Sequence, residues 1–139
     1  MGAAVLISKF ANFLVADVQL KPSKLKNALD VSGAVDVAAT ASVLESFRKA
    51  YGGLWVGGRV TVTSTEVRLS ANAMNRALTS GTMDIALPLP QIQEVTVEGG
   101  FITKIIRLDT TAGSVKFRCY GARGVADLIK SSMLEAKPI

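Results

Sequence analysis

Residues 58–69 read GRVTVTSTEVRL, residues 87–95 read LPLPQIQEV and residues 106–117 read IRLDTTAGSVKF. Each stretch alternates apolar and polar residues with period two, and turn-forming residues separate the runs, as in half-buried antiparallel strands. Within the first stretch, Ser64 and Thr65 separate two such runs so closely that a hairpin is expected. The second half of the chain is therefore predicted to form most of a small antiparallel sheet.

An amphipathic segment follows these strands. Apolar and small residues recur there at helical spacing, on one face, at Val125, Leu128, Ile129, Ser132 and Met133. About five to seven short strands fit a small barrel or two crossed sheets, and a terminal helix can plug an open end. The residues predicted to fill the core are Val60, Val62, Leu69, Leu87, Ile92, Val95, Ile106, Leu108, Val115, Phe117, Leu128 and Ile129.

Composition indicates one folded domain. The chain has 139 residues, of which 49% are apolar and 19% charged, so a disordered chain is disfavoured. The single cysteine, Cys119, lies on the apolar phase of its strand, which indicates a buried thiol and a reducing compartment. The net charge is +5, but the basic residues are dispersed along the chain rather than gathered in a stripe, which argues against a nucleic-acid partner.

The first twenty residues are dense in apolar side chains. Lys9, Asn12 and Asp17 interrupt the run, so a membrane-spanning helix is disfavoured. We expect a helix here that packs on the barrel or on a second chain, with an interfacial membrane helix as the alternative. Its apolar side would carry Leu6, Phe10, Phe13 and Leu14. Deleting residues 1–20 is then expected to leave the strands folded.

Two further helices are predicted before the strands, over residues 23–29 and 36–50, with Gly52 and Gly53 ending the second. Residues 71–82 have the composition of a longer loop. The expected organisation is a helical N-terminal extension over residues 1–50 and a barrel with its C-terminal helix over residues 51–139. The fold class is mainly β, of the α+β type.

The order of these patterns over residues 51–135 resembles the GRAM and bacterial pleckstrin-homology-like family. The resemblance rests on the strand ending at Thr63, on the return strand 67–69, on the Leu-Pro-Leu-x-x-Ile-x-x-Val phrase over 87–95, on the strand 106–110, on Gly113 ahead of Phe117, and on the C-terminal helix. Glu66 and Leu69 stand where the family usually has arginine and often has phenylalanine. The resemblance implies a capped barrel that binds a phosphoinositide, a membrane surface, a peptide or a protein.

The turns of the barrel hold few basic residues, which favours a protein partner or self-association as a homo-oligomer over an anionic lipid, the alternative. A candidate anionic-ligand patch has the members Arg59, Lys104, Arg107, Lys116 and Arg118. The other interpretation of these residues is a set of scattered charges that keep sheet edges from pairing wrongly.

An enzyme is disfavoured because the chain has no histidine, the commonest general base and metal ligand. Cys119 is predicted to point inward, and the carboxylates are scattered. The glycines between residues 52 and 58 lack the helix and lysine of a phosphate-binding loop. We therefore expect no catalytic residue, cofactor or metal, and a cytoplasmic binding module, with peripheral attachment to a membrane as the alternative.

Overall fold

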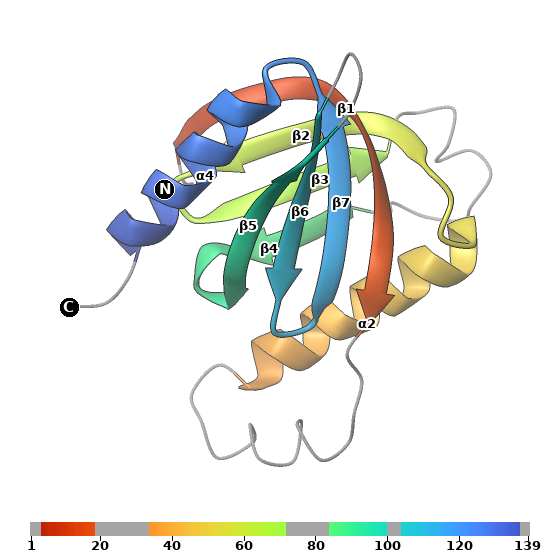
Figure 1. The fold of residues 1–139 in the computed structure, drawn as a ribbon. Coiled ribbons are helices and arrows are strands. Elements are labelled where there is room, and N and C mark those ends of the chain that lie inside the picture. Colours follow the sequence, from red (N-terminus) through yellow and green to blue (C-terminus); the bar gives the residue numbers. More distant parts are fainter. Residues whose placement is uncertain (1–3, 19–33, 72–83, 100–103, 137–139) are drawn as a thin grey trace.

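The computed structural model describes residues 4–18, 34–71, 84–99 and 104–136. Within these residues seven strands form one antiparallel sheet in the order β4-β3-β2-β1-β7-β6-β5 (Figure 1). The strands are β1 (Val5–Val18), β2 (Val56–Thr63), β3 (Glu66–Ala71), β4 (Asp84–Pro88), β5 (Ile92–Glu98), β6 (Lys104–Thr110) and β7 (Gly113–Cys119). The remaining elements are α2 (Ala34–Tyr51), the short 3₁₀ turn η1 (Leu89–Gln91) and α4 (Ala122–Ala136). The predicted mainly β fold with a C-terminal helix is confirmed.

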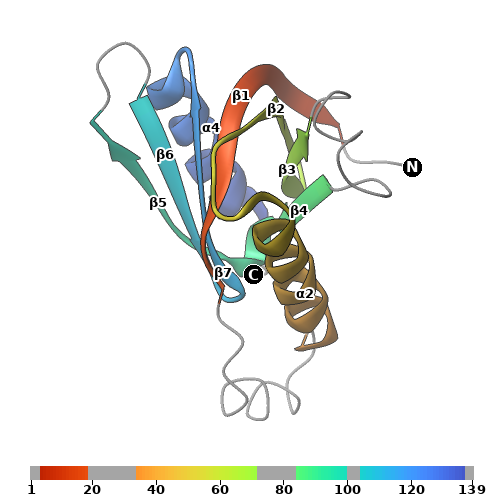
Figure 2. The same ribbon diagram turned by 90° about the vertical axis from the view of Figure 1, so that its right-hand side faces the viewer.

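β1 is the strand about which the sheet folds. It pairs with β2 from Val5 to Phe13 and with β7 from Asn12 to Val18, so its two ends belong to different halves of the sheet. Figure 2 shows the curved β1 between the half that holds β2, β3 and β4 and the half that holds β5, β6 and β7. The two crossed halves enclose the core, as expected for a small barrel.

The predicted helix at the N-terminus is wrong, because this segment is the central strand β1. Burial along it alternates: Ala11, Phe13 and Val15 are buried, whereas Phe10 and Asn12 are exposed. Because apolar residues occur on both phases of the strand, some of them fall at the i, i+3 and i+4 spacing that is typical of one face of a helix. Pairing with strands on both sides satisfies the backbone of β1, so deleting residues 1–20 would remove the middle of the sheet rather than an appendage.

The boundary predicted at residue 50 does not follow the sheet, because β1 precedes it and the other six strands follow it. The helix α2 also joins this core. The ring of Phe47 in α2 lies 5.3 Å from that of Phe13 in β1, and both side chains are fully buried. Residues 34–51 are thus packed against the strands rather than extending away from them, with α2 across the lower end of the folded sheet in Figure 1.

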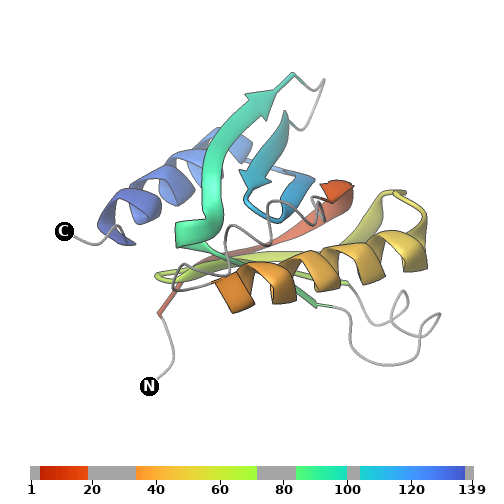
Figure 3. The same ribbon diagram turned by 90° about the horizontal axis from the view of Figure 1, so that it is seen from below.

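Both described helices bury one face, but with departures from the predicted stripes, because Val43 of α2 is 38% exposed and Leu128 and Met133 of α4 are only partly buried. In α2 the buried side chains are Thr40, Ala41, Leu44 and Phe47, and the positive φ of Gly52 and Gly53 ends the helix as expected. In α4 the buried side chains include Val125, Ile129 and Ser132, and this helix packs on β5, β6 and η1. Figure 3, from below, shows α2 and α4 in separate positions around the sheet. The helix predicted over 23–29 and the loop beyond Ala71 lie outside the described residues.

Eleven of the twelve predicted core residues are buried, and the exception, Leu128, is partly buried at the margin of the core.

The side-chain hydroxyl groups of two threonines stabilise the turns of two hairpins. Thr63 accepts hydrogen bonds from the N–H groups of Thr65 and Glu66, at 3.2 and 3.0 Å. Thr110 likewise accepts from the N–H groups of Ala112 and Gly113, both at 3.1 Å. These turns hold the register that separates the core face from the outer face.

Candidate functional site

The outer face of the sheet, turned away from the core, has arginines and aromatic rings along β1. Residues directly opposite each other on paired strands share a face. The register places Phe10 of β1 opposite Arg59 of β2, and Asn12 of β1 opposite Arg118 of β7. Arg59 and Arg118 therefore flank β1 on its two sides and belong to the same face.

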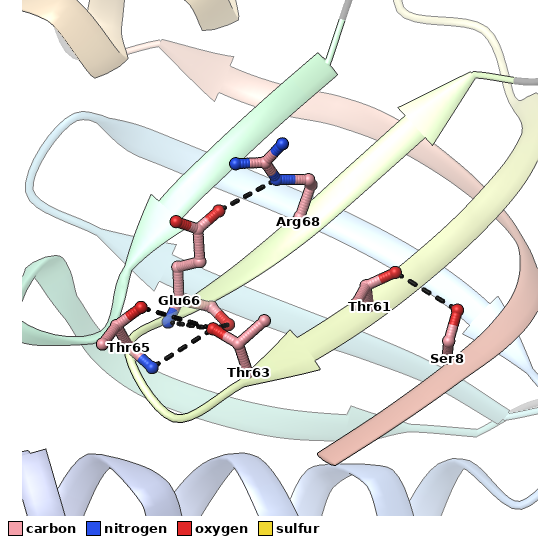
Figure 4. Close-up of polar contacts among 6 residues, drawn as sticks. All are labelled: Ser8, Thr61, Thr63, Thr65, Glu66 and Arg68. Atoms are coloured by element: carbon pink, nitrogen blue, oxygen red, sulfur yellow. Dashed lines mark hydrogen bonds and ion pairs between the residues drawn. The ribbon is translucent and has the colours of Figure 1, made fainter. Parts of the chain in front are cut away.

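Phe10 and Arg59 form the first of two stacked pairs. The guanidinium carbon of Arg59 lies 4.5 Å from the centroid of the Phe10 ring, within the range of a cation–π contact. Nη1 of Arg59 also donates a hydrogen bond to Oγ of Ser8, at 3.0 Å. Ser8 in turn lies 3.3 Å from the hydroxyl of Thr61 (Figure 4). The phenylalanine is 79% exposed, so the stack holds the guanidinium in place at the surface.

Trp55 and Arg118 form the second pair. The guanidinium carbon of Arg118 lies 4.2 Å from the centroid of the indole ring, and Trp55 remains 36% exposed. Nε of Arg118 is buried and has no hydrogen-bond partner within the described part of the chain. We name the four residues Phe10, Trp55, Arg59 and Arg118 the arginine–aromatic platform.

Three other basic residues of this face, Arg68, Arg107 and Lys116, are each paired with an acid around the platform. Arg68 donates from Nε to a carboxylate oxygen of Glu66 at 3.0 Å, close to the Thr63 turn (Figure 4). In the other half of the sheet, Nε of Arg107 donates to Asp109 at 2.9 Å, and Nζ of Lys116 donates to Glu98 at 3.2 Å. Arg59 and Arg118 form no ion pair with any residue that the structure describes.

The Asp109 carboxylate is the most strongly held of these acids. Burial alone would raise its pKa, but hydrogen bonds from Ser114, at 2.7 Å, and from Arg107 outweigh it, and the pKa of Asp109 is lowered. The same hydrogen bond to Asp109, with the attraction between the two charges, raises the pKa of Arg107. Both groups are therefore charged near neutral pH and already occupied with each other.

The structure brings four of the five predicted patch residues onto the outer face. Arg107 and Lys116 lie opposite each other on β6 and β7, but each has an acidic partner. Arg59 and Arg118 belong to the platform. Lys104 lies opposite the buried Cys119 and so belongs to the core-facing phase. Binding of an anion by these residues stays a prediction, and the patch members on the outer face without an acidic partner among the described residues are Arg59 and Arg118.

The predicted oligomer or membrane face is not a single face, because the segment is a strand. Phe13 points into the core and is fully buried. Leu6, Phe10 and Leu14 lie on the opposite phase, where Leu6 is 45% exposed and Leu14 is partly buried. Leu14 lies opposite Lys116, beside the platform. Three of the four residues thus remain at the surface, arranged along a strand rather than around a helix.

Trp55 is the platform residue that the sequence patterns leave unassigned. The strand period does carry a signal for it, because Val56, Val60 and Val62 fill the core and Trp55 falls on the same outward phase as Arg59. Its partner Arg118 lies on a strand that is distant in sequence. Only the pairing of β1 with both β2 and β7 brings the two side chains together.

The described residues offer neither an exposed thiol nor a cluster of metal ligands. Cys119 is buried, and burial raises the pKa of its thiol, which keeps it protonated and unreactive. Among the described residues no three histidine, cysteine or acidic side chains are close enough together to hold a metal ion. The described helices also include none with the length and hydropathy of a membrane span. The platform offers donors and apolar rings, which are groups for binding.

Comparison with known proteins supports the fold. No known family and no curated protein matches this sequence. Among solved structures, the C-terminal domain of an unknown protein from Leishmania infantum is similar over 96% of this chain and 86% of that chain, with a TM-score of 0.54 at 11% identity. At this identity the similarity shows the fold alone.

Two pleckstrin-homology domains also match at lower TM-scores. The Vps36 N-terminal domain has a TM-score of 0.43 at 16% identity, over 56% of this chain and 62% of that one. The Slm1 domain, solved in complex with inositol-4-phosphate, has a TM-score of 0.46 at 8% identity, over 96% and 97% of the two chains. The shared fold therefore rests on the Leishmania domain.

Proposed function

We propose that the chain is a non-enzymatic binding module of the pleckstrin-homology-like, GRAM-type architecture, and that its arginine–aromatic platform recognises a protein partner. The antiparallel strand order and the C-terminal helix support the architecture. The buried free thiol of Cys119 suits the reducing conditions of the cytoplasm, where we place the module.

The observation that carries the proposal is the pair of stacks, Phe10 with Arg59 and Trp55 with Arg118, on one face. Arginine and large aromatic residues are enriched at the energetic centres of protein interfaces, where a partner buries them completely. The ring of an aromatic residue also limits the motion of the guanidinium above it, so less conformational entropy is lost on binding. The platform is thus prepared for contact before a partner arrives.

An anionic membrane surface is the second candidate. Leu54, next to Trp55, is 71% exposed, and exposed apolar side chains beside cations are typical of proteins that bind at a membrane interface. The charges around the platform oppose this function, because the carboxylates of Glu66, Glu98 and Asp109 share the outer face and would approach lipid phosphates. Their basic neighbours are already paired. A protein partner therefore fits the described face better.

Sedimentation with lipid vesicles tests the choice. Vesicles of phosphatidylcholine with added phosphatidylserine or a phosphoinositide should bind the chain weakly, with no preference among phosphoinositides, and the binding should fade as salt rises to about 0.15 M. Light scattering on the same sample reports whether a second copy of the chain is the partner. Tight, headgroup-selective sedimentation that persists at this salt concentration would favour the membrane instead.

A further inference from the structure

We infer that the partner contacts the platform with an acidic, extended segment whose two carboxylates bind Arg59 and Arg118 together; this inference rests on the protein-binding function proposed above. Both guanidiniums lack an acidic partner within the described residues, although other basic residues on the same face, such as Arg68 and Lys116, have one. On the platform itself, the positive charge without an acidic partner is therefore concentrated at two points. An acidic segment complements it.

The spacing of the two arginines sets the spacing of the carboxylates. Arg59 and Arg118 lie on opposite sides of β1, offset by two residues along it, from Phe10 to Asn12. With neighbouring strands about 4.8 Å apart and about 3.4 Å per residue along a strand, their Cα atoms are roughly 12 Å apart. An extended segment covers this distance in about three or four residues. Because successive side chains of an extended segment point to opposite faces, both acids meet the platform only at an even spacing. The expected motif is thus a pair of aspartates or glutamates at positions i and i+4.

The chemistry of the two stacks favours carboxylates over other acceptors. A guanidinium whose face lies on a ring keeps the N–H donors of its edge available, and their planar fork matches the two oxygens of a carboxylate. At Arg118 the buried Nε is unpaired within the described part of the chain, so the remaining donors of that group carry its hydrogen bonding. The exposed edges of Phe10 and Trp55 provide apolar contact for the residues between the two acids.

A second copy of the chain fits this site less well. A symmetric dimer formed through the outer face would bring the same face against itself, with unpaired arginines meeting unpaired arginines. Of the acids of that face, Glu66, Glu98 and Asp109 are already bound to their own basic neighbours, and Glu94 lies on the edge strand β5, three strands from β1. The charges of this face therefore favour an acidic segment of another protein over a second copy.

The test is a selection from a displayed library of random peptides against the full chain, followed by affinity measurements on synthetic peptides. Against the natural sequence, the selected peptides should carry two acidic residues at positions i and i+4. Selection against Arg59→Gln or Arg118→Gln should each enrich only one acidic position. A peptide selected against the natural chain should bind each variant about tenfold or more weakly than it binds the natural chain, as expected for a lost hydrogen bond between charged groups.

Arg68→Gln is the matched control. It removes the same charge from an exposed arginine on the same face, but this arginine is paired with Glu66 and lies outside the platform. The affinity of Arg68→Gln for the selected peptide should stay within about twofold of that of the natural chain, because the effect of net charge alone is small at physiological salt. Arg118→Lys keeps the charge but not the planar fork, so its affinity for the selected peptide should lie between those of the natural chain and Arg118→Gln. This intermediate affinity separates recognition from damage to the fold.

Other outcomes overturn the inference in distinguishable ways. Peptides that lack the acidic pair but still depend on Trp55 and Phe10 would contradict the inference and leave the protein-binding function standing. Peptides that bind all the arginine variants equally would also contradict it. Self-association that Arg59→Gln abolishes would identify a second copy as the occupant. No selected peptide, together with tight vesicle binding, would refute both proposals.

Discussion

The guanidinium carbon of Arg118 lies 4.2 Å from the centre of the Trp55 ring, and this contact joins β7 to the residue that precedes β2. The strand β1 runs between the two, so the stack extends over the strand about which the sheet folds. It also places the protein's single tryptophan at the proposed recognition surface. Trp55 is therefore a built-in reporter for that surface.

Ion quenching of Trp55 fluorescence should reveal the local positive charge. Iodide should quench Trp55 more strongly than caesium at constant ionic strength, because a cation within 4.2 Å attracts the anion and repels the cation. Arg118→Gln should lower the ratio of the two quenching constants, whereas Arg68→Gln should leave it unchanged. An unchanged ratio in Arg118→Gln would mean that the stack is not formed in solution.

Two phenylalanines on opposite phases of β1 should differ sharply in their contribution to stability. Phe13→Ala should reduce the free energy of unfolding by about 3–5 kcal/mol, because Phe13 is fully buried against Phe47, and Phe117→Ala by a similar amount. Phe10→Ala should cost at most about 1 kcal/mol, the value of an exposed cation–π contact. Urea denaturation followed by circular dichroism measures these differences. Equal costs at the two positions of β1 would contradict the strand register.

Replacement of two glycines by alanine should change the stability of the fold in opposite directions. A Cβ atom at Gly58 would collide with the backbone oxygen of Ser70 and approach Cε1 of Phe13 at 3.0 Å, so Gly58→Ala should be clearly destabilising. At Gly124, inside α4, an added Cβ would meet nothing within 4 Å. Gly124→Ala should raise the stability by up to about 1 kcal/mol, since alanine favours the helix. Thermal unfolding of both variants provides the comparison.

The lowered pKa of Asp109 predicts a contribution to acid stability. Because the folded-state pKa lies below the ordinary value of 3.8, the charged carboxylate stabilises the fold at pH values above that value, and the stabilisation is lost as the pH falls through the folded-state pKa. The stability difference between the natural chain and Asp109→Asn should therefore shrink below about pH 4. Urea titrations across this range measure it. Ser114→Ala, which removes one hydrogen bond to the carboxylate, should weaken the same dependence, and a difference that stays constant with pH would contradict the assignment.

Period-two patterns were sufficient to predict most of the sheet, because in β2, β3, β6 and β7 one phase is polar and the other apolar. The sequence of β1 does not follow this pattern. Phe10 and Leu14 on its outer phase are as apolar as Phe13 and Val15 on its inner phase, so the sequence has no clean alternation. Which phase faces the core is decided by the pairing with β2 and β7, which is information that the segment does not contain by itself.

The candidate site was predictable only in part, for a related reason. Alternation placed Lys116 and Arg118 on the phase opposite the core, and both lie there. It did not reveal that Lys116 has Glu98 as a partner whereas Arg118 has an aromatic ring, since both partners come from other strands or from the segment before β2. Sequence spacing gives the face of a residue, and the fold decides whether its charge is already neutralised.

The most direct test of the account is protection of Trp55 from iodide, titrated in parallel with a peptide selected against the chain and with phosphatidylserine vesicles at about 0.15 M salt. The account predicts saturable protection by the peptide, lost in Arg118→Gln, and no protection by the vesicles. Protection by the vesicles at this salt concentration without protection by the peptide would contradict it and identify the platform as a membrane-binding surface.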